Sequence, residues 1–278
     1  MTHGQLIKQL RRERGLTQSE LCEGLCSRTT LATFETRGVR INFELMQQLL
    51  NRLNVTLNEY DFLYRKGVLD QKHELGKLLE LNDNKQEAKK ATRLLYAYFI
   101  DTKDQYYYCL FAERELLNSI YFDGPYQTTV EEIATNLHQY LDRVPTWGRF
   151  EIGIFSSCMF VFSTEYILAV QKNVIPRAAA FQEDVYLSTD IEVLVLDGIA
   201  LAINRDSLDL FQAFSDQLNI LSQRQLVASE IKILSLVIDS WRLKDQDSLT
   251  DRLRMMKELG FPKFAAQCEE FFDKHPAS

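Results

Sequence analysis

Apolar residues recur with a helical period along the chain, and no run alternates with the period of two that marks a strand. In the N-terminal part this pattern predicts five short helices over residues 5–14, 18–24, 28–35, 43–53 and 57–64. Thr17 stands before the second helix with Glu20 three residues later, as in a capping box, and Ser27 stands before the third. The sequence therefore predicts an all-α protein that begins with a small helical bundle.

From Leu69 onward the predicted helices are longer and recur in pairs at intervals of roughly 40 residues, as in tetratricopeptide-like arrays. The clearest pairs cover residues 191–205 with 206–221, and 225–244 with 249–260, and a break is expected near Ser188 and Thr189. Such pairs stack into a superhelix with a concave inner groove. We predict an N-terminal helix-turn-helix bundle in residues 1–66 and a C-terminal superhelical array of degenerate tetratricopeptide-like helix pairs in residues 67–278.

Charge is divided unevenly between these two parts. Residues 1–66 hold ten Lys and Arg against seven Asp and Glu, a net charge of +3, whereas the rest of the 278-residue chain carries −10. A basic module joined to an acidic body suits a polyanionic partner that the body itself would repel.

Other features of the composition exclude several classes of protein. The five cysteines are scattered and never spaced as CxxC, which indicates reduced thiols rather than a disulfide framework or a metal site. The four histidines lie far apart, and no catalytic or nucleotide-binding motif is present. We therefore expect no enzyme, no catalytic residue, no cofactor and no metal. Without a signal peptide or a membrane-spanning apolar run, we expect a cytoplasmic protein with no membrane partner.

The second and third helices, joined by a tight connection, describe a helix-turn-helix whose third helix enters the major groove of DNA. Leu31 and Phe34 would face the core, while the polar residues of that helix face outward. Arginine suits guanine, and threonine can contact base edges, thymine methyl groups or phosphate. We expect base contacts from Arg28, Thr29, Thr30 and Thr33, and phosphate contacts from Arg12, Gln18, Arg37 and Arg40. The alternative is a helical bundle with a merely solvated polar face.

Several stretches resemble the Rgg/GadR/MutR regulators of Gram-positive bacteria, which carry an Xre-type helix-turn-helix. They are LRRERGLTQSEL, SRTTLATFE and NRLNVTLNEY in the N-terminal part, and WGRFE at 147–151 and LDGI at 196–199. Relatives usually read FERG where this chain has Phe34-Glu35-Thr36-Arg37-Gly38, so the arginine is displaced by one place. The resemblance implies a cytosolic quorum-sensing receptor that binds short, imported pheromone peptides in the groove of its repeats.

Together these observations predict a regulator that binds an inverted-repeat operator in double-stranded promoter DNA as a homodimer, because one helix-turn-helix reads too few bases. Polar and aromatic residues of the inner helices are the expected peptide contacts: Tyr107, Arg149, Ser156, Asp197, Asn204, Trp241 and Arg242. The alternative for each is an ordinary packing residue. Asp197, where relatives often have an amide, would favour a peptide with a donor or a positive charge. Two other functions stay open: a helical-repeat protein–protein interaction module, and a DNA-binding repressor without a small ligand.

Overall fold

The computed structural model describes residues 1–66, 71–79, 84–175, 185–224 and 227–277. The chain divides into two compact units, Met1–Leu78 and Leu79–Ser278, which are described separately below. Residues 67–70, where the sequence places the boundary between the two domains, lie outside the described residues. The all-α prediction is confirmed, since the described segments form helices and contain no strand.

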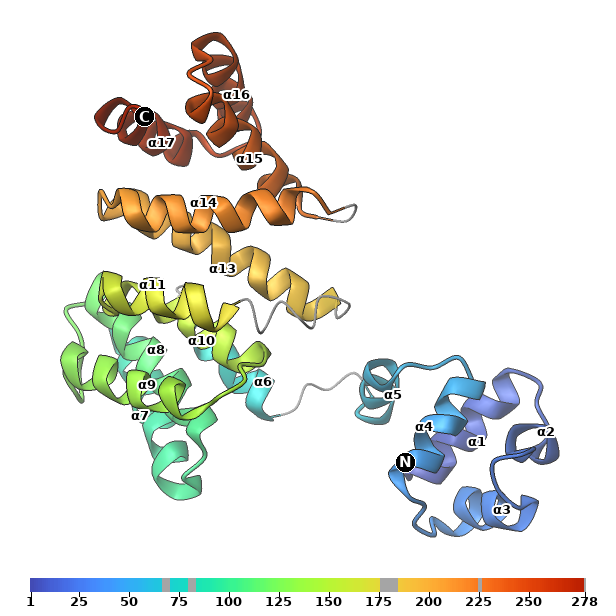
Figure 1. Ribbon diagram of the computed structural model, residues 1–278. Coiled ribbons are helices and arrows are strands. Elements are labelled where there is room, and N and C mark those ends of the chain that lie inside the picture. Colours follow the sequence, from blue (N-terminus) through green and yellow to red (C-terminus); the bar gives the residue numbers. More distant parts are fainter. Residues whose placement is uncertain (67–70, 80–83, 176–184, 225–226, 278) are drawn as a thin grey trace. The chain divides into compact units, whose positions relative to one another are not determined.

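The first unit contains the predicted helical bundle (Figure 1). Its helices are α1 (His3–Glu13), α2 (Gln18–Cys22), α3 (Arg28–Arg37), α4 (Phe43–Arg52), α5 (Leu57–Tyr64) and α6 (Gln71–Gly76). The 3-10 helix η1 (Lys77–Leu79) follows at the boundary between the two units. Thr17 caps α2 by accepting from the Glu20 amide at 3.2 Å, and the Glu20 carboxylate accepts from the Thr17 amide at 2.6 Å. Ser27 caps α3 through the Thr30 amide at 3.0 Å. The capping residues predicted from the sequence therefore set where α2 and α3 begin.

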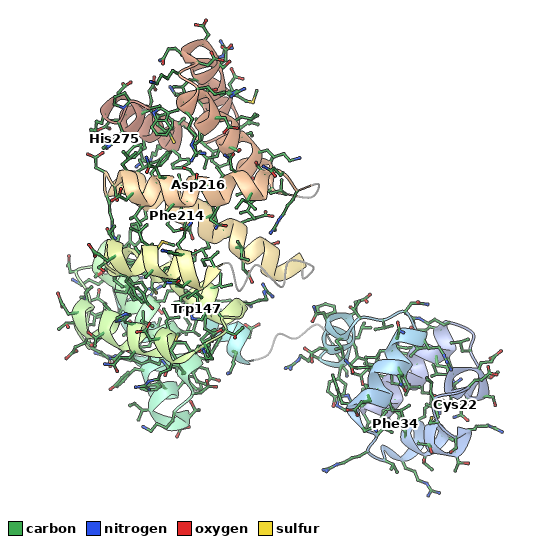
Figure 2. The ribbon with its side chains drawn as sticks, viewed as in Figure 1. Cys22, Phe34, Trp147, Phe214, Asp216 and His275 are labelled. Atoms are coloured by element: carbon green, nitrogen blue, oxygen red, sulfur yellow. The ribbon has the colours of Figure 1, made fainter. Side chains whose placement is uncertain are left out.

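Helix α3 is held close to α1 in the core of this unit. A Cβ atom on Gly4 would lie 1.9 Å from the carbonyl oxygen of Phe34, so only glycine permits this approach of α1 to α3. Leu31 and Phe34 are buried, as predicted, against a core that includes Leu6, Ile7, Leu10, Leu21, Cys22, Leu49 and Leu50 (Figure 2). The opposite face of α3 is left to solvent.

The second unit consists of helices that follow one another through the stack (Figure 1). They are α7 (Lys85–Thr102), α8 (Gln105–Tyr121), α9 (Val130–Arg143), α10 (Arg149–Cys158), the 3-10 helix η2 (Met159–Val161), α11 (Thr164–Asn173), α13 (Val185–Asn204), α14 (Leu208–Ser222), α15 (Ser229–Arg242), α16 (Gln246–Glu258) and α17 (Pro262–Lys274). The break expected near Ser188 and Thr189 is wrong, because α13 runs through both residues. Helix propensity is a weak prior that packing against neighbouring helices overrides.

Two close contacts set the position of α13 in this stack. On one side, a Cβ on Gly198 would lie 2.4 Å from the ring of Phe214 on α14, so these two helices pack at close range (Figure 2). On the other side, Arg149 and Ser156 of α10 bond to Asp190 and Asp197 of α13, and both pairs are 41 residues apart. Equal offsets mean that α10 and α13 run parallel, as equivalent helices of successive repeats do.

Nothing in the described part of the chain combines the length and the apolar character that a helix needs to cross a membrane.

Candidate DNA and peptide sites

The N-terminal end of α3 presents an exposed polar surface. Arg28, Thr29 and Thr30 are exposed, and no described residue bonds to the Arg28 guanidinium. Thr30 shares a hydrogen bond of 2.9 Å with the Ser27 hydroxyl. Thr33 is half-buried, and its hydroxyl donates to the carbonyl oxygens of Thr29 and Thr30 at 2.9 and 3.0 Å. Of these four predicted base contacts, the side chain of Arg28 is therefore the most accessible to a DNA base and that of Thr33 the least.

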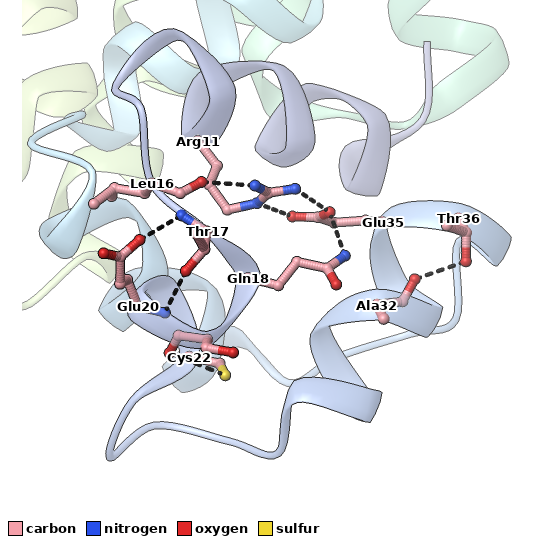
Figure 3. A network of polar contacts seen from close by, with 10 residues as sticks. Arg11, Leu16, Thr17, Gln18, Glu20, Cys22, Ala32, Glu35 and Thr36 are labelled. Carbon is pink, nitrogen blue, oxygen red and sulfur yellow. Dashed lines mark hydrogen bonds and ion pairs between the residues drawn. The ribbon is translucent and has the colours of Figure 1, made fainter.

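A buried ion pair fixes the orientation of α3 (Figure 3). Arg11 donates from Nε to Glu35 Oε1 at 2.7 Å and from Nη2 to Oε2 at 2.8 Å, and its side chain is 8% exposed while that of Glu35 is fully covered. Arg11 also donates to the Leu16 carbonyl oxygen at 2.7 Å. Gln18 completes the network by donating to Glu35 Oε2 at 2.9 Å. The network ties α1, α2 and α3 together and pairs both of its buried charges.

The electrostatics of this network favour the charged form of Glu35. Burial raises the pKa of its carboxyl, but the hydrogen bonds from Arg11 and Gln18 and the positive charge of Arg11 lower it by more. The net result is a pKa below the ordinary value for glutamate. The Arg11–Glu35 pair was not predicted from the sequence, and Gln18 was expected to contact phosphate alone. Glu35 follows Leu31 at the helical spacing of an inward position, which is the signal that could have revealed it.

The other predicted phosphate ligands lie on the surface of the same unit. Arg12 is on α1, Arg37 is the last residue of α3, and Arg40 follows Gly38, whose φ of 65° ends the helix. All three side chains are exposed. Arg52 has a structural role that the sequence did not reveal. It donates to the carbonyl oxygens of Leu21 and Glu23 and so satisfies acceptors at the C-terminal end of α2.

Four of the predicted peptide contacts lie along α10 and α13 in the second unit. Arg149 Nε bonds to Asp190 Oδ2 at 2.5 Å, and Ser156 Oγ donates to Asp197 Oδ2 at 2.5 Å. Further along α13, Asn204 Oδ1 accepts from Gln267 Nε2 of α17 at 3.1 Å. Asp197 is exposed by area, yet neighbouring atoms desolvate its carboxylate and raise its pKa, which the bond from Ser156 opposes only in part.

The remaining three predicted contacts lie elsewhere in the unit. Tyr107 is 6% exposed and packs against the rings of Tyr98 and Tyr106. Trp241 is 8% exposed, stacks on Phe272 at 5.2 Å, and donates its indole N–H to the His275 carbonyl oxygen. Arg242 forms an ion pair of 2.7 Å with Asp216 of α14. Tyr107 and Trp241 are therefore buried against other rings, and their contact with a peptide stays a prediction.

A pocket opens beside Asp197, between α13 and α15. It encloses about 230 Å³ and is lined by Leu196, Asp197, Ala200, Glu230, Ile233, Leu234, Met256, Phe261 and Phe264. We call it the α13–α15 pocket. Its lining is apolar except for two carboxylates, and none of the described residues that line it is basic.

Comparison with known proteins decides the family. The sequence profile of the C-terminal domain of the HTH-type transcriptional regulator Rgg matches residues 92–270, which is more than half of the chain. This chain belongs to the Rgg family. A helix-turn-helix profile matches residues 7–60, in agreement with the bundle of α1–α5. No curated protein matches the chain in sequence.

Solved structures show the same fold as this Rgg-family chain along its whole length. The SHP pheromone receptor Rgg2 of Streptococcus dysgalactiae is 18% identical, with a TM-score of 0.73 over 98% of this chain and 99% of the receptor. A mutant form of PrgX is 16% identical, with a TM-score of 0.77 over 100% of this chain and 96% of PrgX. PrgX in complex with cCF10 is 17% identical, with a TM-score of 0.73 over 99% and 100%. The predicted architecture and family are therefore confirmed, and the family is one of transcriptional regulators.

Proposed function

We propose that this Rgg-family regulator binds inverted-repeat promoter DNA as a homodimer through α3, and that a short peptide bound along α10 and α13 controls this binding in the cytoplasm. The exposed N-terminal end of α3 carries the proposal, because no described residue engages Arg28 there while the buried Arg11–Glu35 pair fixes the helix behind it. A recognition helix must be held in a fixed orientation and must expose the side chains at its N-terminal end.

The proposal of a peptide ligand is supported by the relatives and by the second unit. Rgg2 is described as a pheromone receptor, and PrgX has been solved in complex with cCF10. In this chain, four polar residues named from the sequence occur along α10 and α13, and the α13–α15 pocket opens next to one of them. Stacked helix pairs commonly bind extended peptides on one face.

The proposal of a homodimer is supported by an apolar surface on the first unit. Val39, Phe43 and Leu57 are 51%, 59% and 45% exposed and line a groove of about 970 Å³ near the C-terminal end of α3. Exposed apolar surface of this kind on a small domain usually marks a contact with another protein. A second copy would place a second recognition helix beside the first and read the other half of an inverted repeat.

The proposed DNA site is tested by substituting Arg28. Arg28→Ala should lose most of the preference for the operator over scrambled DNA, equivalent to about 1–3 kcal/mol of discrimination, while the fold stays intact. Fluorescence anisotropy with DNA from upstream of the gene and its neighbours, at two salt concentrations, measures this. Arg65→Ala is the matched control, because Arg65 is an exposed arginine of the same unit, paired with Asp61 of α5. If Arg28→Ala keeps its operator preference, α3 is not the reading helix.

Salt dependence separates DNA binding from the function of a protein–protein module. Operator affinity should fall steeply as salt rises, because arginines that contact phosphates release condensed counterions. Removing one phosphate contact, as in Arg40→Ala, should reduce the slope of log affinity against log salt by about one and leave selectivity unchanged. Weak binding that is equal for both DNAs, with and without peptide, would contradict a DNA-binding function.

A further inference from the structure

The α13–α15 pocket combines apolar walls with two carboxylates. Its walls are apolar, with Ile233, Met256, Phe261 and Phe264 contributed by α15, α16 and the start of α17. Asp197 of α13 and Glu230 of α15 also line the pocket, and both residues are exposed. An occupant must therefore offer apolar surface and tolerate two negative charges at once.

Neither carboxylate has a basic partner among the described residues. Asp197 accepts from the Ser156 hydroxyl, and Glu230 accepts from Ser229 Oγ at 3.1 Å. Asp190, earlier on the same α13, is different because it is already neutralised by Arg149. Neighbouring atoms partly desolvate the Asp197 carboxylate and raise its pKa, so a cation beside it would favour its charged form.

The size of the pocket limits what enters it. A volume of about 230 Å³ is below the range of about 300–1,000 Å³ typical of sites that enclose a whole small molecule. It can hold one anchoring group of a longer ligand, and the row of polar residues along α10 and α13 extends from it. A cation beside that anchor would be attracted by both carboxylates, whereas a ligand carboxylate there would be repelled.

We propose that the α13–α15 pocket takes an apolar side chain of the peptide while Asp197 and Glu230 hold a positively charged group next to it. This inference rests on the proposed peptide-binding function and specifies the ligand as an apolar peptide with a cation beside its anchor. The cation is either a basic side chain or the free amino terminus, because both present N–H donors with a positive charge.

The test uses the full chain and pooled short apolar peptides in which one position holds Lys, norleucine or Glu, each pool made with a free or an acetylated amino terminus. Retention of each pool by the immobilised protein is quantified by mass spectrometry. We expect the cationic pools to be retained about tenfold better than the neutral ones, and the Glu pools least. If acetylation of the amino terminus removes the preference, the cation is the amino terminus. If replacement of Lys by norleucine removes it, the cation is the side chain.

Variants then locate the preference. Asp197→Asn and Glu230→Gln keep the shape of each side chain and should bring cationic and neutral pools to similar retention. Glu131→Gln removes an equal charge from an exposed position on α9, outside the pocket, and should keep the preference. Ala200→Phe, which fills the pocket, should weaken retention of every pool.

The outcomes distinguish this inference from the function on which it rests. Pools that are retained without regard to charge, or a charge preference unchanged in Asp197→Asn and Glu230→Gln, would overturn the inference and leave peptide binding in place. If no pool is retained by the folded protein, with or without operator DNA, peptide binding itself fails and the inference fails with it.

Discussion

At the scale of single residues, the buried pair between Arg11 and Glu35 is the contact that orients α3 in the first unit. It is bidentate, buried, and completed by Gln18 and the Leu16 carbonyl oxygen (Figure 3). Such a pair adds little net stability compared with apolar residues, but removing one partner leaves a buried charge without compensation. Its contribution is to hold α3 in one orientation relative to α1 and α2.

Glu35→Gln should therefore destabilise the first unit by about 3 kcal/mol, because Arg11 would stay buried opposite a neutral amide. Hydrogen exchange measured by mass spectrometry on the full chain would report this as faster exchange in peptides from α1 to α3. Glu23→Gln, at an exposed residue just after α2, is the matched control and should change stability by less than about 0.5 kcal/mol. Equal protection in both variants would show that the ion pair does not support the unit.

The same carboxylate makes the stability of the unit depend on pH. The folded-state pKa of Glu35 is lowered, so its contribution is fully present above the unfolded-state pKa of about 4.3 and is lost as pH falls through the folded value. Protection of α1–α3 should decline below about pH 4, and the decline should be shallower in Glu35→Gln. An identical pH profile in the variant would mean that other carboxylates dominate acid unfolding.

At the scale of elements, two helix-interior glycines of the second unit have opposite surroundings. Gly198 on α13 faces the ring of Phe214, which is 1% exposed and would lie 2.4 Å from an added Cβ. Gly153 on α10 is exposed, and a Cβ there would meet nothing within 4 Å. The first glycine is required by helix packing, whereas the second only weakens its helix.

Gly153→Ala should raise stability by about 0.5–1 kcal/mol, because alanine is the better helix former. Gly198→Ala should lower it by about 1–3 kcal/mol, because the added methyl group forces α13 away from α14. Thermal unfolding followed by circular dichroism compares the two variants, each serving as the control for the other. Shifts of the same sign would contradict the close packing of α13 against α14.

At the scale of the whole molecule, the proposed regulation requires that peptide binding and DNA binding are energetically coupled. If peptide changes operator affinity by some factor, operator DNA must change peptide affinity by the same factor. For an effective switch that factor is about 5–150. The two sites to be coupled in the proposed function are the tip of α3 and the face along α10 and α13.

Peptide affinity should differ by a certain factor between titrations with and without operator DNA. Titrations of operator DNA with and without peptide should give the same factor for the affinity of DNA. Fluorescence anisotropy of labelled peptide and of labelled DNA provides both values. Scrambled DNA is the control and should leave peptide affinity unchanged. A single peptide affinity under all conditions would show that the peptide does not control DNA binding through this protein.

What the sequence determined by itself was local. Helical periodicity and the caps at Thr17 and Ser27 predicted the helices of the first unit to within a few residues, because both act over a few positions of the chain. The 40-residue recurrence predicted the repeats, and it reappears as the 41-residue offset between Arg149 and Asp190. Family motifs named the architecture, which the solved structures share.

What only the tertiary structure decided was which side chains meet. The sequence could not show that Glu35 pairs with Arg11, that Gly198 accommodates Phe214, or that Tyr107 and Trp241 are buried. Nor could it join Asp197 to Glu230 in one pocket, since they lie on different helices brought together by packing. Periodicity specifies which face of a helix is apolar, but the partner of that face depends on how the helices stack.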